Sequence, residues 1–250
     1  MIYTLLTGEV VEILHKGSLV QLTVKKPVSL SNVKQLEAVI FELDGIITDS
    51  SEYHYLAWKA LADELAISFD REKHVRLKGH SRMECLEILL EGSGLNLPQP
   101  VKGMLCNKKN EKYKQLIQQM TPDDLHPGIH SLLTDLKKKR IPVGLASVNE
   151  NAMLILERLK IGRLFQAIAD PKNIRMGKPD PEIYLQVTEM LGISPDCCVA
   201  IEDTAEGIAA SKAAGMRSVG AGSPSLKESA ELWFPSTAEL HVEELVQLFK

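Results

Sequence analysis

The chain has 250 residues, of which 44% are hydrophobic and 25% are charged, as is ordinary for a soluble globular protein. Its length allows one large domain or two small ones. The formal net charge of −4 argues against nucleic acid as the main partner. Because no apolar stretch reaches about 18 residues and no charged-then-apolar leader follows Met1, we expect a cytoplasmic protein without a membrane partner.

Residues 1–33 form a first segment that is rich in β-forming residues, with turn signals between them. The alternation of Leu19 to Val24 and the glycines Gly8 and Gly17 predict two or three short antiparallel strands. Such a ribbon is marginally stable alone and has to pack on something. We therefore treat residues 1–33 as a short β-rich N-terminal extension.

A second pattern begins at Glu37. Ala38 to Phe41 is a continuous apolar run that ends at an acidic turn, which is typical of a parallel strand buried on both faces. Similar runs recur at Ile141 to Ala146, Ala167 to Ala169, Cys198 to Ile201 and Arg217 to Gly220. Helical patterns alternate with them, at His130 to Lys139, Met153 to Leu159, Pro181 to Leu191 and Glu206 to Ala214. This alternation predicts an α/β fold with a doubly wound parallel-sheet core domain.

The region between Ser51 and Gln119 contains no convincing strand. Apolar residues recur there at helical spacing in Tyr53 to Leu65, Met83 to Leu90 and Lys108 to Gln119. The sequence therefore predicts an α-helical cap domain, residues 50–122, inserted into a core formed by residues 34–49 and 123–250.

Polar residues follow the predicted core strands at the points where the strands end. A strand-end aspartate by itself is more often a helix cap or a turn former. In an open parallel sheet, however, ligands bind beyond the carboxyl ends of the strands, and four such clusters in strand order indicate one site. The clusters are Glu42 with Asp44, Ser147 with Asn149, Lys178, and Glu202 with Asp203.

The chemistry of these residues converges. Carboxylates suit a hard cation such as Mg²⁺, which takes oxygen ligands and substrate phosphate. A serine hydroxyl and a lysine can stabilise the phosphate oxygens whose charge develops during transfer. One carboxylate can act as the nucleophile and form an acyl phosphate, and a second carboxylate two residues on can move the proton. The sequence therefore predicts a magnesium-dependent phosphoryl-transfer site.

The same clusters lie in segments that resemble the four ordered motifs of the haloacid dehalogenase superfamily. These segments are Phe41 to Asp49, Leu145 to Ser147, Gly177 to Pro181 and Ile201 to Ile208. The resemblance spans roughly residues 36–250. It implies that Glu42 occupies the nucleophile position, that Asp44 is the general acid/base, and that Ser147 and Lys178 hold the transferring phosphoryl group. The implied Mg²⁺ ligands are Glu42, Asp44 through its carbonyl, Glu202 and Asp203.

Within the superfamily, the inserted region is similar to that of the β-phosphoglucomutases, which interconvert β-glucose 1-phosphate and glucose 6-phosphate through a bound glucose 1,6-bisphosphate. Thr48 to His54 is similar to the hinge of that family, and Leu77 to Arg82 resembles its specificity loop. The resemblance implies a small-molecule sugar phosphate as substrate. The implied distal-phosphate residues are Arg82, Asn149 and Asn151, and the implied cap residues are His54, Trp58, Lys78, Gly79 and Lys109. For His54 and Trp58, four residues apart on a predicted helix, packing is an equal alternative.

Two residues depart from the family pattern. Glu42 stands where the family has aspartate, and a displacement of about an ångström by its extra methylene can cost on the order of 100-fold in rate. Glu150 stands where the family usually has lysine against the distal phosphate, so an anion replaces a cation and should weaken binding. A sugar-phosphate phosphatase of the same superfamily and a catalytically silent sugar-phosphate-binding homologue therefore stay open as alternatives.

Residues 1–33 resemble a different family. Tyr3 to Glu9, His15 to Gly17 and Val20 to Thr23 are similar to the C-terminal β-sandwich end of inverting disaccharide phosphorylases, the maltose and trehalose phosphorylase group. Those enzymes release β-glucose 1-phosphate, which the mutase family consumes. The resemblance implies a phosphorylase partner or an origin in a phosphorylase–mutase fusion.

Overall fold

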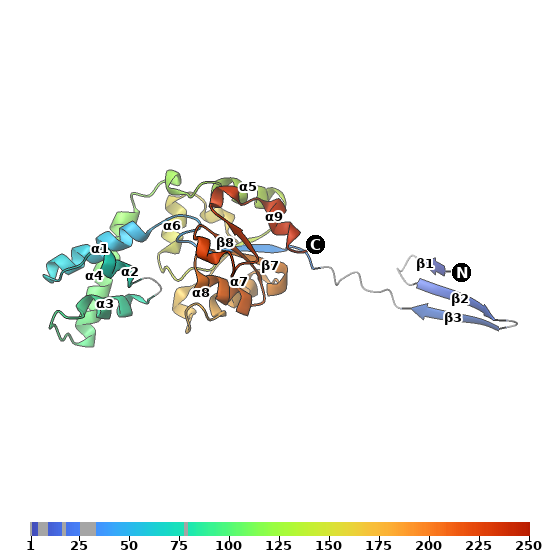
Figure 1. The fold of residues 1–250 in the computed structure, drawn as a ribbon, viewed down its shortest axis with the longest axis horizontal. Coiled ribbons are helices and arrows are strands. Elements are labelled where there is room, and N and C mark those ends of the chain that lie inside the picture. Colours follow the sequence, from blue (N-terminus) through green and yellow to red (C-terminus); the bar gives the residue numbers. More distant parts are fainter. Residues whose placement is uncertain (1, 5–9, 17–18, 26–33, 78–79) are drawn as a thin grey trace. The chain divides into compact units, whose positions relative to one another are not determined.

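The computed structural model describes residues 2–4, 10–16, 19–25, 34–77 and 80–250 (Figure 1). The chain divides into two units, Met1–Gln35 with Phe249, and Leu36–Leu248 with Lys250. The first unit contains an antiparallel sheet of order β1-β2-β3, with β1 at Ile2–Thr4, β2 at Val10–Lys16 and β3 at Leu19–Lys25. The predicted antiparallel strands are confirmed, while the turn glycines Gly8 and Gly17 lie outside the described residues.

The second unit is built on a six-stranded sheet whose strand pairs are all parallel. Its central strand β4 is buried along its whole length, as its continuous apolar run requires. The predicted strands are confirmed, and one edge strand was not predicted because its three half-buried residues carry no continuous apolar run. In spatial order the strands are β6 (Ala167–Ile168), β5 (Val143–Leu145), β4 (Ala38–Phe41), β7 (Cys198–Glu202), β8 (Arg217–Ala221) and β9 (Leu232–Phe234).

Helices cover both faces of this sheet. The helices α5 and α9 lie on one side and α7 and α8 on the other (Figure 1), which confirms the doubly wound α/β fold. Among the described residues, no helix has the length and apolar character needed to cross a membrane. The core helices are α5 (Ile129–Lys138), α6 (Ala152–Arg158), α7 (Glu182–Leu191), α8 (Ala205–Ala213) and α9 (Val242–Gln247).

The chain between β4 and α5 forms the predicted helical cap. Its helices are α1 (Ser51–Glu64), α2 (Arg71–Val75), α3 (Arg82–Leu90) and α4 (Gln99–Ile117). The helices α1 and α3 pack on α4 around a cluster that includes Trp58, Leu86 and Cys106. The prediction placed the start of α4 at Lys108, nine residues too late, because Pro100 and Gly103 interrupt the helical pattern of its first turns. The boundaries of cap and core at residues 50 and 122 stay predictions.

Two glycines let the backbone approach acidic side chains closely. Gly45 has φ of +85°, and a Cβ there would lie 2.1 Å from Asp203 Oδ2. Gly207, in the first turn of α8, would place a Cβ 2.0 Å from Glu202 Cδ. The fold therefore has no room for a side chain at either position while the two carboxylates stay where they are.

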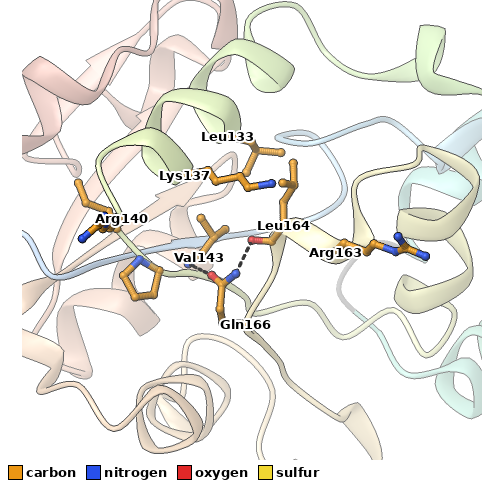
Figure 2. Close-up of a pocket in the computed structure, with 9 residues that line it drawn as sticks. Leu133, Lys137, Arg140, Val143, Arg163, Leu164 and Gln166 are labelled. Atoms are coloured by element: carbon orange, nitrogen blue, oxygen red, sulfur yellow. Dashed lines mark hydrogen bonds between the residues drawn. The ribbon is translucent and has the colours of Figure 1, made fainter.

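A surface pocket of about 270 Å³ lies between the end of α5, the start of β5 and the turn Gly162–Leu164 (Figure 2). The side chain of Lys137 extends over Val143, and Gln166 accepts a hydrogen bond from the Val143 N–H at 2.8 Å. Val143 is the first residue of β5, so this pocket is at the amino end of the strand. It is thus distinct from the edge at which the predicted site residues lie.

We expect Gly207→Ala to destabilise the protein by about 1–3 kcal/mol, because the added Cβ would displace the buried Glu202 side chain. Gly103→Ala is the matched control, since a Cβ there meets nothing within 4 Å, and the helix α4 should gain about 0.5–1 kcal/mol. Urea unfolding of both variants measures the two changes. Equal midpoints for the two variants would contradict the close packing of Glu202 on Gly207.

Candidate active site

Three neighbouring strands bring the predicted site residues together. The strand β4 pairs in parallel with β5 on one side and with β7 on the other, so their carboxyl ends share one edge. Glu42 follows β4 directly, Ser147 lies two residues after β5, and Asp203 follows β7. Residues more than a hundred positions apart in sequence therefore meet at one place.

Lys178 joins two of these strand ends. Its ammonium group forms close ion pairs with Glu42 Oε2 and Glu202 Oε1, and it donates a hydrogen bond to the Ala146 carbonyl at 3.1 Å. Tyr184, from α7, donates a hydrogen bond to the same oxygen of Glu202. The Lys178 side chain is 12% exposed and that of Glu202 is fully buried. The Lys178–Glu202 pair is therefore held away from solvent. A buried charge needs a partner of opposite charge, and each of these groups provides one for the other.

The electrostatics of this cluster are strongly coupled. Burial opposes the charge of Lys178, but Glu202 and Glu42 together raise its pKa, so the lysine stays protonated. Burial raises the pKa of Glu42, the Lys178 charge lowers it, and the neighbouring Glu202 raises it again. Glu42 Oε1 also accepts a hydrogen bond from the Leu43 N–H at 2.9 Å. Both oxygens of the predicted nucleophile thus have protein partners.

Asp44 lies apart from the lysine and is held by two neutral donors. Its Oδ1 accepts from the Ser50 N–H at 3.1 Å and its Oδ2 accepts from Asn149 Nδ2 at 3.2 Å. Burial raises the pKa of Asp44, and the hydrogen bonds from Ser50 and Asn149 partly oppose this change. A carboxyl group whose pKa moves toward neutral pH can both donate and accept a proton, which is what a general acid/base requires.

Asp203 is the third carboxylate, after Glu42 and Glu202, near the single positive charge of Lys178. Burial, followed by the charges of Glu202 and Glu42, raises the pKa of Asp203 to about 7, and Lys178 opposes only part of this change. Lys178 alone therefore does not balance the carboxylates Glu42, Glu202 and Asp203. An excess of buried carboxylate oxygens of this kind fits a hard divalent cation.

The predicted Mg²⁺ ligands are not gathered as a cage of side chains. Among the described residues, no three acidic, histidine or cysteine side chains converge as a metal site. Glu202 uses Oε1 for Lys178 and Tyr184, and its Oε2 accepts from the Asp203 N–H and the Thr204 hydroxyl. Each Glu202 oxygen thus accepts from two donors, whereas each Glu42 oxygen accepts from one and keeps a lone pair. The set that fits Mg²⁺ is therefore smaller, namely the Asp203 and Glu42 carboxylates with the Asp44 carbonyl, leaving further positions for phosphate and water.

A buried amine lies on the cap side of the site. Lys109, from α4, is 3% exposed, and its Nζ lies 2.8 Å from Nδ1 of His54, which belongs to α1. Its ammonium also faces the rings of Trp58 at 5.0 Å and Tyr113 at 4.8 Å. Burial and then the Arg82 charge lower the pKa of Lys109 to about 7, and burial and then Lys109 hold the pKa of His54 well below 6.5. Trp58 thus serves both the packing of the cap and the environment of Lys109.

Tyr113 is a site residue that the sequence pattern did not reveal. Its hydroxyl lies 2.8 Å from Ser50 Oγ and accepts a hydrogen bond from Asn149 Nδ2 at 3.0 Å. Its ring stacks on His54 with centroids 4.0 Å apart. The available signal was its spacing of four residues from Lys109, which places both on one helix face.

The predicted distal-phosphate residues lie where the helical cap meets the core. Arg82 begins α3, where the Ser81–Glu84 capping box fixes the helix start. Its Nη2 lies 3.1 Å from Glu150 Oε2, and Asn151 Nδ2 donates to Asn110 Oδ1 at 2.9 Å. The predicted specificity-loop residues Lys78 and Gly79 lie outside the described residues.

Comparisons with known proteins agree with this architecture. Residues 39–221 match the family model described as haloacid dehalogenase-like hydrolase. The chain is 47% identical over 210 residues to the β-phosphoglucomutase of Bacillus subtilis, an alignment that covers 83% of this chain and 93% of that protein. The chain therefore belongs to the haloacid dehalogenase-like hydrolase family, and these relatives support its being an enzyme of that family.

Two further relatives frame the range of activities. The chain is 31% identical over 189 residues to a phosphorylated carbohydrates phosphatase of Thermotoga maritima, which covers 74% of this chain and 84% of that protein. A crystal structure of β-phosphoglucomutase from Clostridium difficile matches with a TM-score of 0.80 at 39% identity, covering 86% of this chain and 97% of that one. The resemblance of residues 1–33 to phosphorylases lies outside the range that the family model matches and stays a prediction.

We expect Lys109→Met to stabilise the protein at neutral pH by on the order of 2 kcal/mol, because it removes a buried ammonium that has no ion-pair carboxylate among the described residues. The unfolded chain protonates this lysine below its ordinary pKa of 10.5, whereas the folded chain does so only below about 7. The advantage of the variant should therefore be complete below about pH 7 and decrease as pH rises toward 10.5. Chemical denaturation at several pH values measures it.

Lys108→Met is the matched control for this variant. Lys108 is the preceding residue of α4, and its side chain is 59% exposed in a surface pair with Glu64. Its replacement should change stability by no more than about 0.5 kcal/mol, without the pH trend. Destabilisation by Lys109→Met would show that the lysine is a structural residue.

Proposed function

We propose that this chain is a cytoplasmic, magnesium-dependent phosphomutase that interconverts β-glucose 1-phosphate and glucose 6-phosphate. The observation that carries the proposal is that Asp44, two residues after Glu42, is held by Ser50 and Asn149, whereas Glu42 is paired with Lys178. This arrangement provides a nucleophile, a cation for phosphoryl charge and a separate proton carrier. The 47% identity to a β-phosphoglucomutase supports the sugar phosphate as substrate.

The first half-reaction transfers a phosphoryl group from Glu42 to the sugar. In the phosphorylated enzyme, a Glu42 oxygen is bonded to phosphorus as an acyl phosphate. The 6-hydroxyl of β-glucose 1-phosphate attacks that phosphorus, Asp44 accepts the hydroxyl proton, and the bond from Glu42 to phosphorus breaks. The product is β-glucose 1,6-bisphosphate with the Glu42 carboxylate restored.

The second half-reaction reverses these roles after the bisphosphate has turned round. Glu42 attacks the phosphorus at C1, the bond from phosphorus to the C1 oxygen breaks, and Asp44 returns its proton to that oxygen. Glucose 6-phosphate leaves and the acyl phosphate is regenerated. Lys178 and Ser147 stabilise the phosphoryl oxygens in both directions.

Magnesium, when bound by Asp203, Glu42 and the Asp44 carbonyl, would supply positive charge that neutralises the transferring phosphoryl group. Lys178 contributes the second positive charge, and its raised pKa keeps it protonated through the cycle. Hydrolysis of the acyl phosphate would convert a mutase into a phosphatase. The mutase reaction therefore requires that the cap exclude water from this bond.

A sugar-phosphate phosphatase is the second candidate, and the Arg82–Glu150 ion pair favours it. A mutase needs a cation for the phosphate that is not being transferred. The predicted cation, Arg82, is already paired with Glu150, whose Oε2 lies 3.1 Å from Arg82 Nη2. A phosphatase that acts on a monophosphate has no such need. The 31% identity to a carbohydrate phosphatase supports this alternative.

The test follows product formation from β-glucose 1-phosphate with Mg²⁺ and a trace of glucose 1,6-bisphosphate. Isomerisation to glucose 6-phosphate supports the mutase, and release of free phosphate supports the phosphatase. Chelation of Mg²⁺ should abolish either reaction. A chain that binds the sugar phosphate without either product is a silent homologue.

Glu42→Asp should raise kcat on the order of 100-fold, because aspartate withdraws the carboxylate by about an ångström toward the position that the family uses. The ion pair with Lys178 can persist, so stability should change little. Steady-state kinetics of the purified variant measures the gain. Asp44→Asn is the negative control, since it keeps the shape of the side chain but cannot carry the proton. Unchanged or lower turnover in Glu42→Asp would show that the site has adapted to glutamate.

A further inference from the structure

Three consecutive residues after β5, the 149–151 segment, each contact a different side chain of the cap. Asn149 Nδ2 donates to the Tyr113 hydroxyl at 3.0 Å, and Asn151 Nδ2 donates to Asn110 Oδ1 at 2.9 Å. Between them, Glu150 Oε2 lies 3.1 Å from Arg82 Nη2. The two asparagine contacts are buried and neutral, whereas the Glu150 contact is an ion pair at the edge of the site, with side chains 37% and 21% exposed.

The ion pair lies beside the proton carrier and a second cap cation. Asn149 also donates to Asp44 Oδ2 at 3.2 Å, so Glu150 is one residue from a direct contact of Asp44. Burial and then the positive charge of Arg82 lower the pKa of Lys109, so the two basic side chains share one region of the cap. Among the described residues, Glu150 is the acidic side chain that forms an ion pair with Arg82.

An anion that approaches Arg82 therefore meets a carboxylate already in place. Arginine binds phosphate and carboxylate through the same fork of N–H donors, so the two compete for it. A phosphate group that settles beside Glu150 without displacing it experiences repulsion between like charges. In either case binding is weaker than Arg82 would otherwise provide.

We propose that Glu150 is a specificity-determining residue that occupies Arg82 in place of a phosphate and so weakens the binding of doubly phosphorylated sugars. This inference rests on the proposed function, in which a 1,6-bisphosphate is the intermediate. An enzyme with this residue should release the bisphosphate readily, and its turnover should depend on the concentration of free bisphosphate.

The test measures equilibrium binding of glucose 1,6-bisphosphate by calorimetry without Mg²⁺, so that no transfer is required for the readout. Glu150→Gln should tighten binding about tenfold, as expected for removing one charge at contact distance near the surface. In an Arg82→Gln background the same change should improve binding by no more than about twofold, because no arginine is released. Thermal unfolding of each variant confirms that it is folded.

Glu157→Gln is the matched control for net charge. Glu157 is an exposed residue of α6, the helix that follows the 149–151 segment, and it forms no ion pair among the described residues. Its replacement should leave bisphosphate affinity unchanged within about twofold. An equal gain from Glu157→Gln, an undiminished gain without Arg82, or no gain from Glu150→Gln would each overturn the proposal.

The outcome is separable from that of the proposed function. If no isomerisation occurs but Glu150→Gln still tightens bisphosphate binding through Arg82, the mutase proposal fails and the role of Glu150 stands. If isomerisation occurs and bisphosphate affinity does not respond to Glu150, the specificity proposal alone fails. Undetectable bisphosphate binding to every variant at millimolar concentration also counts against it.

Discussion

The ammonium group of Lys178 pairs with Glu42 after one strand and with Glu202 at the end of the next, and the rest of the site depends on this arrangement. Glu202 is fully buried and Glu42 nearly so. Removing the lysine would leave two uncompensated carboxylates in a low-dielectric environment, a situation that costs several kcal/mol. The lysine thus links the carboxyl ends of β4 and β7 and compensates part of the negative charge there.

This arrangement serves chemistry more than stability. Glu42, Glu202 and Asp203 outnumber the single lysine, and the pKa of Asp203 is raised by burial and then by the charges of Glu202 and Glu42. A protein selected only for stability would place apolar residues there. Gly45 and Gly207 permit the crowding, because any side chain at these positions would overlap a carboxylate. The same excess of negative charge is what a divalent cation would neutralise when bound.

The cap contributes polar contacts that are distinct from its own hydrophobic cluster. Tyr113 contacts Ser50 before α1, Asn149 of the core and, through Asn149, the proposed proton carrier Asp44. The position of α4 is thereby linked to the geometry of Asp44. Lys109, one turn away on the same helix, brings a buried amine to the His54 ring, so α4 supplies both groups from one face.

The chain's local pattern was enough to predict the buried strands, the alternating core helices, the helical insertion and the residues at the strand ends, because each depends on neighbours a few positions away. The short helices α2 and α9 could not be predicted, since five and six residues carry too little periodicity. The strand β9 could not be predicted because its three half-buried residues carry no continuous apolar run. The start of α4 was wrong for a similar reason, because Pro100 and Gly103 are unfavourable by propensity and tolerated in context.

Sequence alone also determined the composition of the site, down to the unusual Glu42 and Glu150. Only the tertiary structure decided which of these groups touch. It paired Lys178 with Glu42 and Glu202, gave both oxygens of Glu202 to protein donors, and set Glu150 against Arg82. Tyr113 entered the site in the same way. These contacts depend on strand order and on how the cap lies on the core, which no local pattern of residues records.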